Sequence, residues 1–310
     1  MNLPDSLRKD GVLSESQAAR LSEIESGRLI SLQRELRLLM YLGALFIVVG
    51  VGATVKRYFS ELGPLSILGA LSSAVAAAFY YCFRKGRPFS HSKAESPFAA
   101  FDYILFLGCA FLGIEFGYIE SHFHLLKNFW DYYLLASACF FFFLAYRFDN
   151  RLVLAMAIIN LGGWMGLRLN HFGLGLDTLK WPAIIYAALL AAAGEALRRT
   201  RLKEHFTDAY FTFALNIACV ALLAGVLKDG FACPEFLLLA ALTAAVIYYA
   251  LERKRFDYFL YAVVYGYIGF SSGIIRLLGG ASAVALYLLV SAAAVMFLIF
   301  QCRRILEQKT

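Results

Sequence analysis

Residues 281–302, ASAVALYLLVSAAAVMFLIFQC, form a run of 22 residues that contains no charged side chain. A helix needs about 20 residues to cross the roughly 30 Å of hydrocarbon in a bilayer. Lipid offers no hydrogen-bonding partner to exposed backbone groups, so a helix is the form that such a run takes in a membrane. The segment therefore predicts a transmembrane α-helix.

Nine further segments of suitable length and hydropathy precede this one. They lie near residues 38–55, 63–83, 102–119, 131–147, 151–169, 181–198, 208–228, 234–251 and 258–275. We therefore expect an all-α, polytopic integral membrane protein with about ten transmembrane helices. Its three parts would be a short helical cytoplasmic segment (1–37), the membrane domain (38–302) and a cytoplasmic tail (303–310).

The composition excludes a soluble globular class. Hydrophobic residues make up 61% of the chain and charged residues only 16%, against roughly 25% charged residues in an ordinary soluble domain. The net charge of +7 does not indicate nucleic acid, because the basic residues lie in short loops and not on one soluble surface. The six cysteines include no C-x-x-C pair, so we expect no metal site and no cofactor.

The distribution of basic residues predicts the orientation. With a cytoplasmic N-terminus, 22 of the 29 Lys and Arg residues fall on the cytoplasmic side and 7 on the other. Short cytoplasmic loops of membrane proteins carry such an excess. The sequence therefore predicts a bacterial cytoplasmic (inner) membrane protein with both termini in the cytoplasm.

A recurring pattern predicts four helix hairpins between two flanking helices. Phe101-Asp102, Phe148-Asp149, Thr207-Asp208 and Phe256-Asp257 each open an outward-running helix. The Asp is expected to cap free backbone N–H groups at the positive end of the helix dipole. A pair of small residues follows, four apart, and such pairs let helices pack closely in lipid. The pairs are Gly113 and Gly117, Gly162 and Gly166, Ala221 and Gly225, and Gly269 and Gly273.

The N-terminal segment carries a resemblance to a known family. The stretch LRKDGVLSESQAARL, followed by LRLLMYLGALFIVVGVG, resembles bacterial predicted membrane proteins grouped as domain of unknown function, family 2157. The resemblance covers about the first 60 residues with some specificity and implies a membrane protein without a particular activity. Residues 14–36 have a basic amphipathic character that suits either membrane entry or docking of a protein partner.

Glu115 is the candidate for chemistry inside the membrane. It lies within the apolar run FLGCAFLGIEFGY, about 20 Å from the cytoplasmic end of its helix. An ionised carboxylate at that depth costs about 2.5–3.5 kcal/mol or more, so it should be protonated, paired or facing a cavity. We expect a role in proton or cation coupling, against the alternative that the side chain reaches the outer interface.

A stripe of tyrosines is the second candidate. Tyr258, Tyr261 and Tyr265 share one face of their helix and adjoin Ser272. They predict either a polar solute path or ordinary packing between helices.

Two functions remain open from the sequence. The first is a permease-like transporter of a small solute or ion. The alternative is a non-transporting scaffold or regulatory subunit that recruits a partner through residues 14–36. No nucleophile and base motif, zinc-protease motif or phosphate loop is present in the sequence, so we expect no enzymatic activity.

Overall fold

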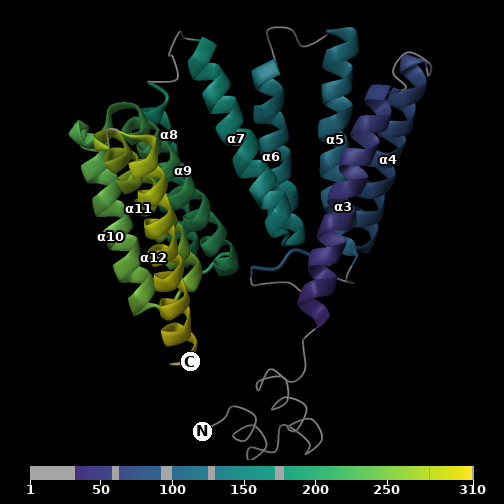
Figure 1. The fold of residues 1–310 in the computed structure, drawn as a ribbon. Coiled ribbons are helices and arrows are strands. Elements are labelled where there is room, and N and C mark those ends of the chain that lie inside the picture. The colour runs from purple at the N-terminus through teal and green to yellow at the C-terminus, as the bar shows by residue number, and fades with distance from the viewer. Residues whose placement is uncertain are drawn as a thin grey trace, which may run out of the picture. The chain divides into compact units, whose positions relative to one another are not determined.

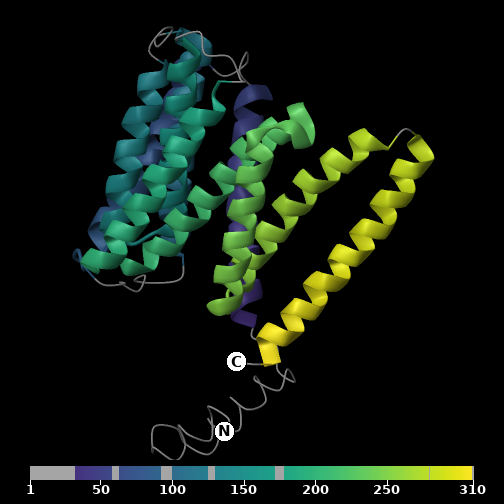
Figure 2. The ribbon, with the colours of Figure 1, turned by 90° about the vertical axis from the view of Figure 1, so that its left-hand side faces the viewer.

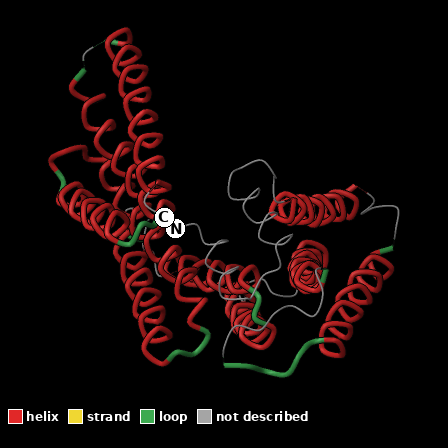
Figure 3. Tube along the Cα trace, turned by 90° about the horizontal axis from the view of Figure 1, so that it is seen from below, coloured by secondary structure: helices red, strands yellow, loops and turns green. Residues whose placement is uncertain are grey.

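The computed structural model describes residues 32–57, 63–91, 100–124, 130–171, 178–278 and 280–308. The predicted partner segment at residues 14–36 therefore lies mostly outside the described residues. All described regular structure is helical, and Figure 3 shows no strand among the described residues. The expected all-α class is confirmed.

The described helices group into two compact units (Figure 1). Among the described helices, the first unit (residues 1–85 with 98–125) includes α3 (Leu32–Arg57), α4 (Pro64–Lys85) and α5 (Phe101–Phe123). The second unit, residues 86–97 with 126–310, contains α6 (Trp130–Phe148), α7 (Arg151–His171), α8 (Lys180–Thr200), α9 (Thr207–Asp229), α10 (Pro234–Glu252), α11 (Phe256–Leu277) and α12 (Ala281–Gln308). The short 3-10 helices η2 (Glu204–Phe206) and η3 (Gly230–Ala232) flank α9.

Ten α-helices thus lie over the ten predicted segments, with ends that differ by a few residues. Seven of these helical segments are long and apolar enough to cross a membrane, among the residues described: α4, α5, α7, α9 with its flanking 3-10 turns, α10, α11 and α12. Helix α3 has a shorter apolar stretch, Leu42–Thr54. Charged and polar residues occupy the end turns of α6 and α8, which lowers their mean hydropathy.

Successive helices pack as the predicted hairpins. The most extensive contacts join α4 with α5, α6 with α7, α8 with α9, and α10 with α11. Helix α12 follows α11 and packs along it at the edge of the second unit (Figure 2). The pairing is observed, while descent of the four hairpins from one repeated unit stays a prediction.

Two of the hairpin turns are built in the same way. Asp149 and Lys254 have the left-handed backbone conformation, with φ of 61° and 55°. The next N–H then bonds back to a buried alanine, from Asn150 to the Ala145 carbonyl and from Arg255 to that of Ala250. This is the hydrogen bond of a Schellman motif, which ends a helix and reverses the chain within a few residues.

The expected capping role of Asp149 is wrong. Asn150 caps α7, because its side-chain oxygen accepts from the N–H groups of Leu152 and Val153 at 2.9 and 3.0 Å. Asp149 precedes the cap and points elsewhere. At α5, α9 and α11 the residues at the cap position, Ala100, Phe206 and Arg255, make no side-chain capping bond. The aspartates there lie in the first turn, where a negative charge suits the helix dipole.

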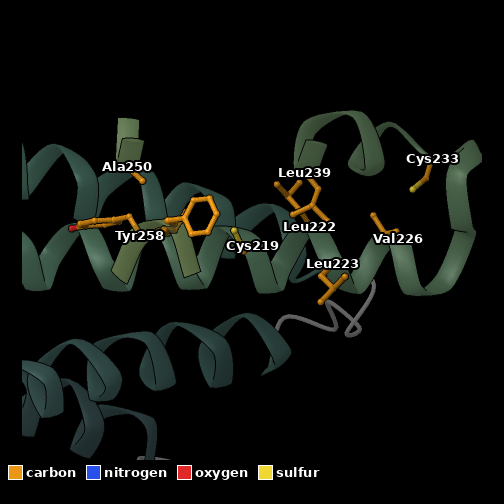
Figure 4. Close-up of a cluster of buried hydrophobic side chains, with 10 residues drawn as sticks. Cys219, Leu222, Leu223, Val226, Cys233, Leu239, Ala250 and Tyr258 are labelled. Atoms are coloured by element: carbon orange, nitrogen blue, oxygen red, sulfur yellow. The ribbon is translucent and has the colours of Figure 1, made fainter. Parts of the chain in front are cut away.

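Helix α9 forms the centre of the second unit. It contacts α8, α10 and α11, and half of its most apolar stretch is buried, whereas none of that of α12 is. A helix that is apolar on every side suits such a central position. Figure 4 shows Leu222, Leu223 and Val226 of α9 in one cluster with Leu239 of α10.

Candidate functional site

Glu115 lies in α5 of the first unit, and its partner comes from α4. The hydroxyl of Ser72 donates to the Glu115 carboxylate. Glu115 is fourteen residues from the start of α5, about 21 Å along the helix, and about 12 Å from its other end at Phe123. The contact therefore lies within two candidate membrane spans and away from their ends.

A hydroxyl is a weak partner for a carboxylate at that depth. Within the described residues, no Lys or Arg pairs with Glu115. A neutral hydroxyl supplies one hydrogen bond but no charge to offset the cost of ionisation in lipid. Glu115 therefore remains the candidate residue for chemistry within this pair of helices.

The tyrosine stripe of α11 belongs to the second unit and faces α9. The Tyr265 hydroxyl donates to Asn216 at 2.9 Å, and the Tyr258 hydroxyl to the carbonyl of Asp208 at 3.5 Å. Tyr261 packs against the buried cluster around α9. Ser272 donates to the Gly269 carbonyl of its own helix. These bonds use the polar groups in helix packing, and a solute path along them stays a prediction.

The predicted small residues fall into two groups, those with a neighbouring side chain close to the position of a Cβ and those with open space there. A Cβ at Gly269 would lie 2.7 Å from Leu239, one at Gly225 2.8 Å from Glu235, and one at Gly162 3.1 Å from Tyr186. Gly273 is closer still to its neighbour Phe231. Ala221 is buried, at 6% exposure. These five positions fit the predicted close-packing role.

The other three glycines do not fit that role. A Cβ at Gly113, Gly117 or Gly166 meets no atom of its own unit within 4 Å. No close approach within the unit is therefore seen at these positions, and their packing role stays a prediction. The spacing of small residues was the same, but the distance to the neighbouring helix differs.

The sequence alone does not reveal the most buried ion pair among the described residues of the second unit. Lys203 is 1% exposed, and its ammonium lies 3.1 Å from the carboxylate of Asp149, whose side chain is 2% exposed. His205 contacts the other oxygen of the same carboxylate. Asp149 lies in the turn between α6 and α7, whereas Lys203 and His205 lie between α8 and α9.

Further bonds tie these two turns to residues 86–91. Arg151 donates to the His205 carbonyl at 2.8 Å, and the Lys203 N–H donates to the His91 carbonyl at 2.9 Å. The Lys203 ammonium also lies over the ring of Phe89, 5.3 Å from its centre. The sequence analysis includes Lys203 only in its count of basic loop residues and does not single out His205, because a single sequence does not mark which loop charge is buried.

A similar but more exposed contact joins α9 to the next turn. Arg255 reaches Asp208 at 3.1 Å and Asp257 at 2.9 Å, and the three side chains are between 35% and 49% exposed. In both places an Asp at the start of one hairpin's second helix binds a basic residue from the following turn.

Two adjoining hollows lie among α8, α9 and α10. The first is an apolar groove of about 640 Å³ whose lining on α8 runs from Trp181 to Arg198. The second is a polar cavity of about 540 Å³ lined by Arg201, Glu204 and neighbouring residues. Both are lined by Arg198, Phe211 and Tyr249, so the groove opens into the cavity.

Metal chemistry has no candidate site here. Over the part of the chain that the structure describes, no three His, Cys, Asp or Glu residues are placed to hold a metal ion. The histidine at 122 stacks on Tyr118 and lies edge-on to Phe123.

Comparison with known families tests the resemblance seen in the N-terminal sequence. Residues 5–154 match the predicted membrane protein family DUF2157. The match confirms the resemblance and extends it well beyond the first 60 residues. No curated protein and no solved structure matches the chain. The match to a predicted membrane protein family and the long apolar helices together show a membrane protein.

Some of the features described above lie within the residues that match DUF2157, and others lie outside them. It spans α3 to α6 and the start of α7, and so includes Ser72, Glu115 and Asp149. Lys203, His205 and the groove between α8 and α10 lie beyond it. The intramembrane carboxyl is thus within the family region, whereas the groove belongs to the remainder of the chain.

Proposed function

We propose that this protein is a permease-like transporter of a small solute or ion, in which Glu115 binds the coupling proton or cation. The observation that carries the proposal is the Ser72 and Glu115 contact inside two candidate membrane spans. Because a lone negative charge is costly in lipid and the Ser72 hydroxyl is neutral, a bound proton or cation would be favoured at this carboxyl. Intramembrane acids of this kind mark ion and proton pathways.

The proposed topology has ten spans and both termini in the cytoplasm of a bacterium, in the inner membrane. The basic residues support it, since 22 of 29 lie on the side assigned to the cytoplasm. Helices α3, α6 and α8 complete the ten. Helices α6 and α8 form extensive contacts with α7 and α9, and α3 forms a smaller contact with α5, so each is shielded from lipid on part of its surface. The proposal includes no enzymatic step.

The test uses ion jumps on the purified, full-length protein in liposomes adsorbed to a solid-supported membrane. Jumps in H⁺, Na⁺ and K⁺ at constant ionic strength probe cation binding without knowledge of the solute. We expect a transient charge displacement with one of these ions, its loss in Glu115→Gln, and a weakened apparent affinity in Ser72→Ala. Glu120→Gln, which removes a carboxylate five residues further along α5, is the matched control and should keep the signal.

Two results of this experiment would contradict transport coupling through Glu115. Either no displacement in the wild-type protein or an unchanged displacement in Glu115→Gln contradicts the proposal. The alternative function, a scaffold that recruits a partner through residues 14–36, would then be the one to pursue.

A further inference from the structure

The groove between α8 and α10 is long enough to hold a lipid tail. Its lining runs along α8 from Trp181 to Arg198, about 26 Å at 1.5 Å per residue. One leaflet of the hydrocarbon core is about 15 Å thick, half of roughly 30 Å. Several of the lining side chains are small and apolar, among them Ala187, Ala191 and Ala218. In a bilayer such a hollow is filled, because an empty one forfeits dispersion contacts along its whole length.

The two ends of the groove differ in their polar surroundings. Near Trp181, the buried carboxylate of Glu235 on α10 pairs with Lys180 on α8, and this pair joins the two walls. At the opposite end the groove opens into the polar cavity. An occupant of both hollows must therefore be amphiphilic, with an apolar tail and a single polar head.

The charges in the cavity define the head. Arg198 is paired with Glu195 at 2.8 Å, Asp208 with Arg255, and His205 with Asp149. In the described part of the chain, neither Arg201 nor Glu204 has an ion pair or a side-chain hydrogen bond. The cavity thus presents one cation and one anion that are not otherwise engaged. A zwitterion complements this arrangement better than a head group of net negative charge.

We infer that the groove and cavity bind one phospholipid with a zwitterionic aminoethyl head group. Its phosphate accepts hydrogen bonds from Arg201, its ammonium donates to Glu204, and an acyl chain lies between α8 and α10 against α9. Basic pockets between helices are a known means of binding lipid head groups. Here the additional carboxylate selects for the amine.

The test is lipid titration of the full-length protein by native mass spectrometry, with dioleoyl phosphatidylethanolamine and dioleoyl phosphatidylglycerol as the two probes. We expect the wild-type protein to retain phosphatidylethanolamine preferentially. Arg201→Gln with Glu204→Gln should weaken that binding about tenfold. Glu204→Gln alone leaves an unopposed cation and should move the preference to phosphatidylglycerol. Glu252→Gln with Arg253→Gln removes a similar exposed pair from another turn and should change nothing.

The groove is tested separately from the cavity. Ala191→Phe places a ring in the groove and should reduce retention of both lipids, while a retained melting temperature shows that the fold persists. The inference is overturned if the wild-type protein retains the two lipids equally or if Ala191→Phe leaves lipid binding unchanged. It is also overturned if the protein retains neither lipid, as it would if the chain's own N-terminal segment filled the groove.

Discussion

The ammonium of Lys203 lies 3.1 Å from the carboxylate of Asp149, and the two side chains are only 1% and 2% exposed. The pair joins the turn between α6 and α7 to the turn between α8 and α9. His205 contacts the same carboxylate, so one Asp serves two basic residues. A buried charge without its partner is costly, and this contact therefore makes the position of each hairpin depend on the other.

Removal of one member of this pair should be strongly destabilising. We expect Lys203→Met to lower the free energy of unfolding by about 3–5 kcal/mol, because the Asp149 carboxylate would stay buried beside a single histidine. The double variant Lys203→Met with Asp149→Asn should lose less than the sum of the single variants. Unfolding in mixed micelles measures these differences. Arg199→Gln, at a side chain that is 79% exposed, should cost under about 1 kcal/mol. Equal losses at Lys203 and Arg199 would contradict the prediction.

The close and open glycines predict opposite effects of one substitution. Gly269→Ala brings a Cβ to 2.7 Å from Leu239 and should destabilise by about 1–3 kcal/mol through overpacking. Gly166→Ala meets nothing within 4 Å and should instead stabilise helix α7, by up to about 1 kcal/mol. Thermal unfolding of the two variants side by side measures the contrast. A stabilising Gly269→Ala would show that α10 and α11 are further apart than in this structure.

The Tyr265 and Asn216 bond predicts a small effect that is not additive with the loss of its partner. Tyr265→Phe removes a 2.9 Å hydrogen bond between α11 and α9, and bonds of this kind in membranes contribute about 0.6 kcal/mol. Asn216→Ala in the same background should then cost little more through this contact. Chemical unfolding of the two single variants and the double variant gives the coupling energy. A loss of several kcal/mol in Tyr265→Phe would indicate that Tyr265 has a further role.

The proposed orientation predicts which loops react with a membrane-impermeant maleimide. Pro88→Cys lies in a loop assigned to the cytoplasm, and Thr178→Cys lies in a loop assigned to the outside. In spheroplasts of a strain that expresses a variant free of native cysteines, Thr178→Cys should react at once. Pro88→Cys should react only after the membrane is permeabilised. The opposite pattern would reverse the topology, and labelling of both from outside would contradict the helix count between them.

Hydropathy and length in the sequence were enough to place the helices. The predicted segments 151–169 and 208–228 correspond to α7 (Arg151–His171) and α9 (Thr207–Asp229) in the structure. The reason is local, because a lipid environment requires each apolar run to satisfy its backbone within its own helix. Consecutive long helices joined by a few residues then pair as hairpins. The candidate Glu115 was also evident, since a lone acid within an apolar run is visible without any neighbour.

What the sequence left undecided depends on distances between segments remote in the chain. The same small-residue spacing gave a tight contact at Gly269 and none at Gly166 within its unit, because the neighbouring helix and not the spacing sets the gap. The sequence predicts Asp149 as a helix cap, but in the structure Asn150 is the capping residue. The left-handed backbone at Asp149 directs its carboxylate toward Lys203 instead. The sequence by itself determined the ten helices described over residues 32–308, their hairpin order and the presence of an acid within an apolar helix. Only the tertiary structure decided which charges are buried and paired, because burial depends on which turns meet.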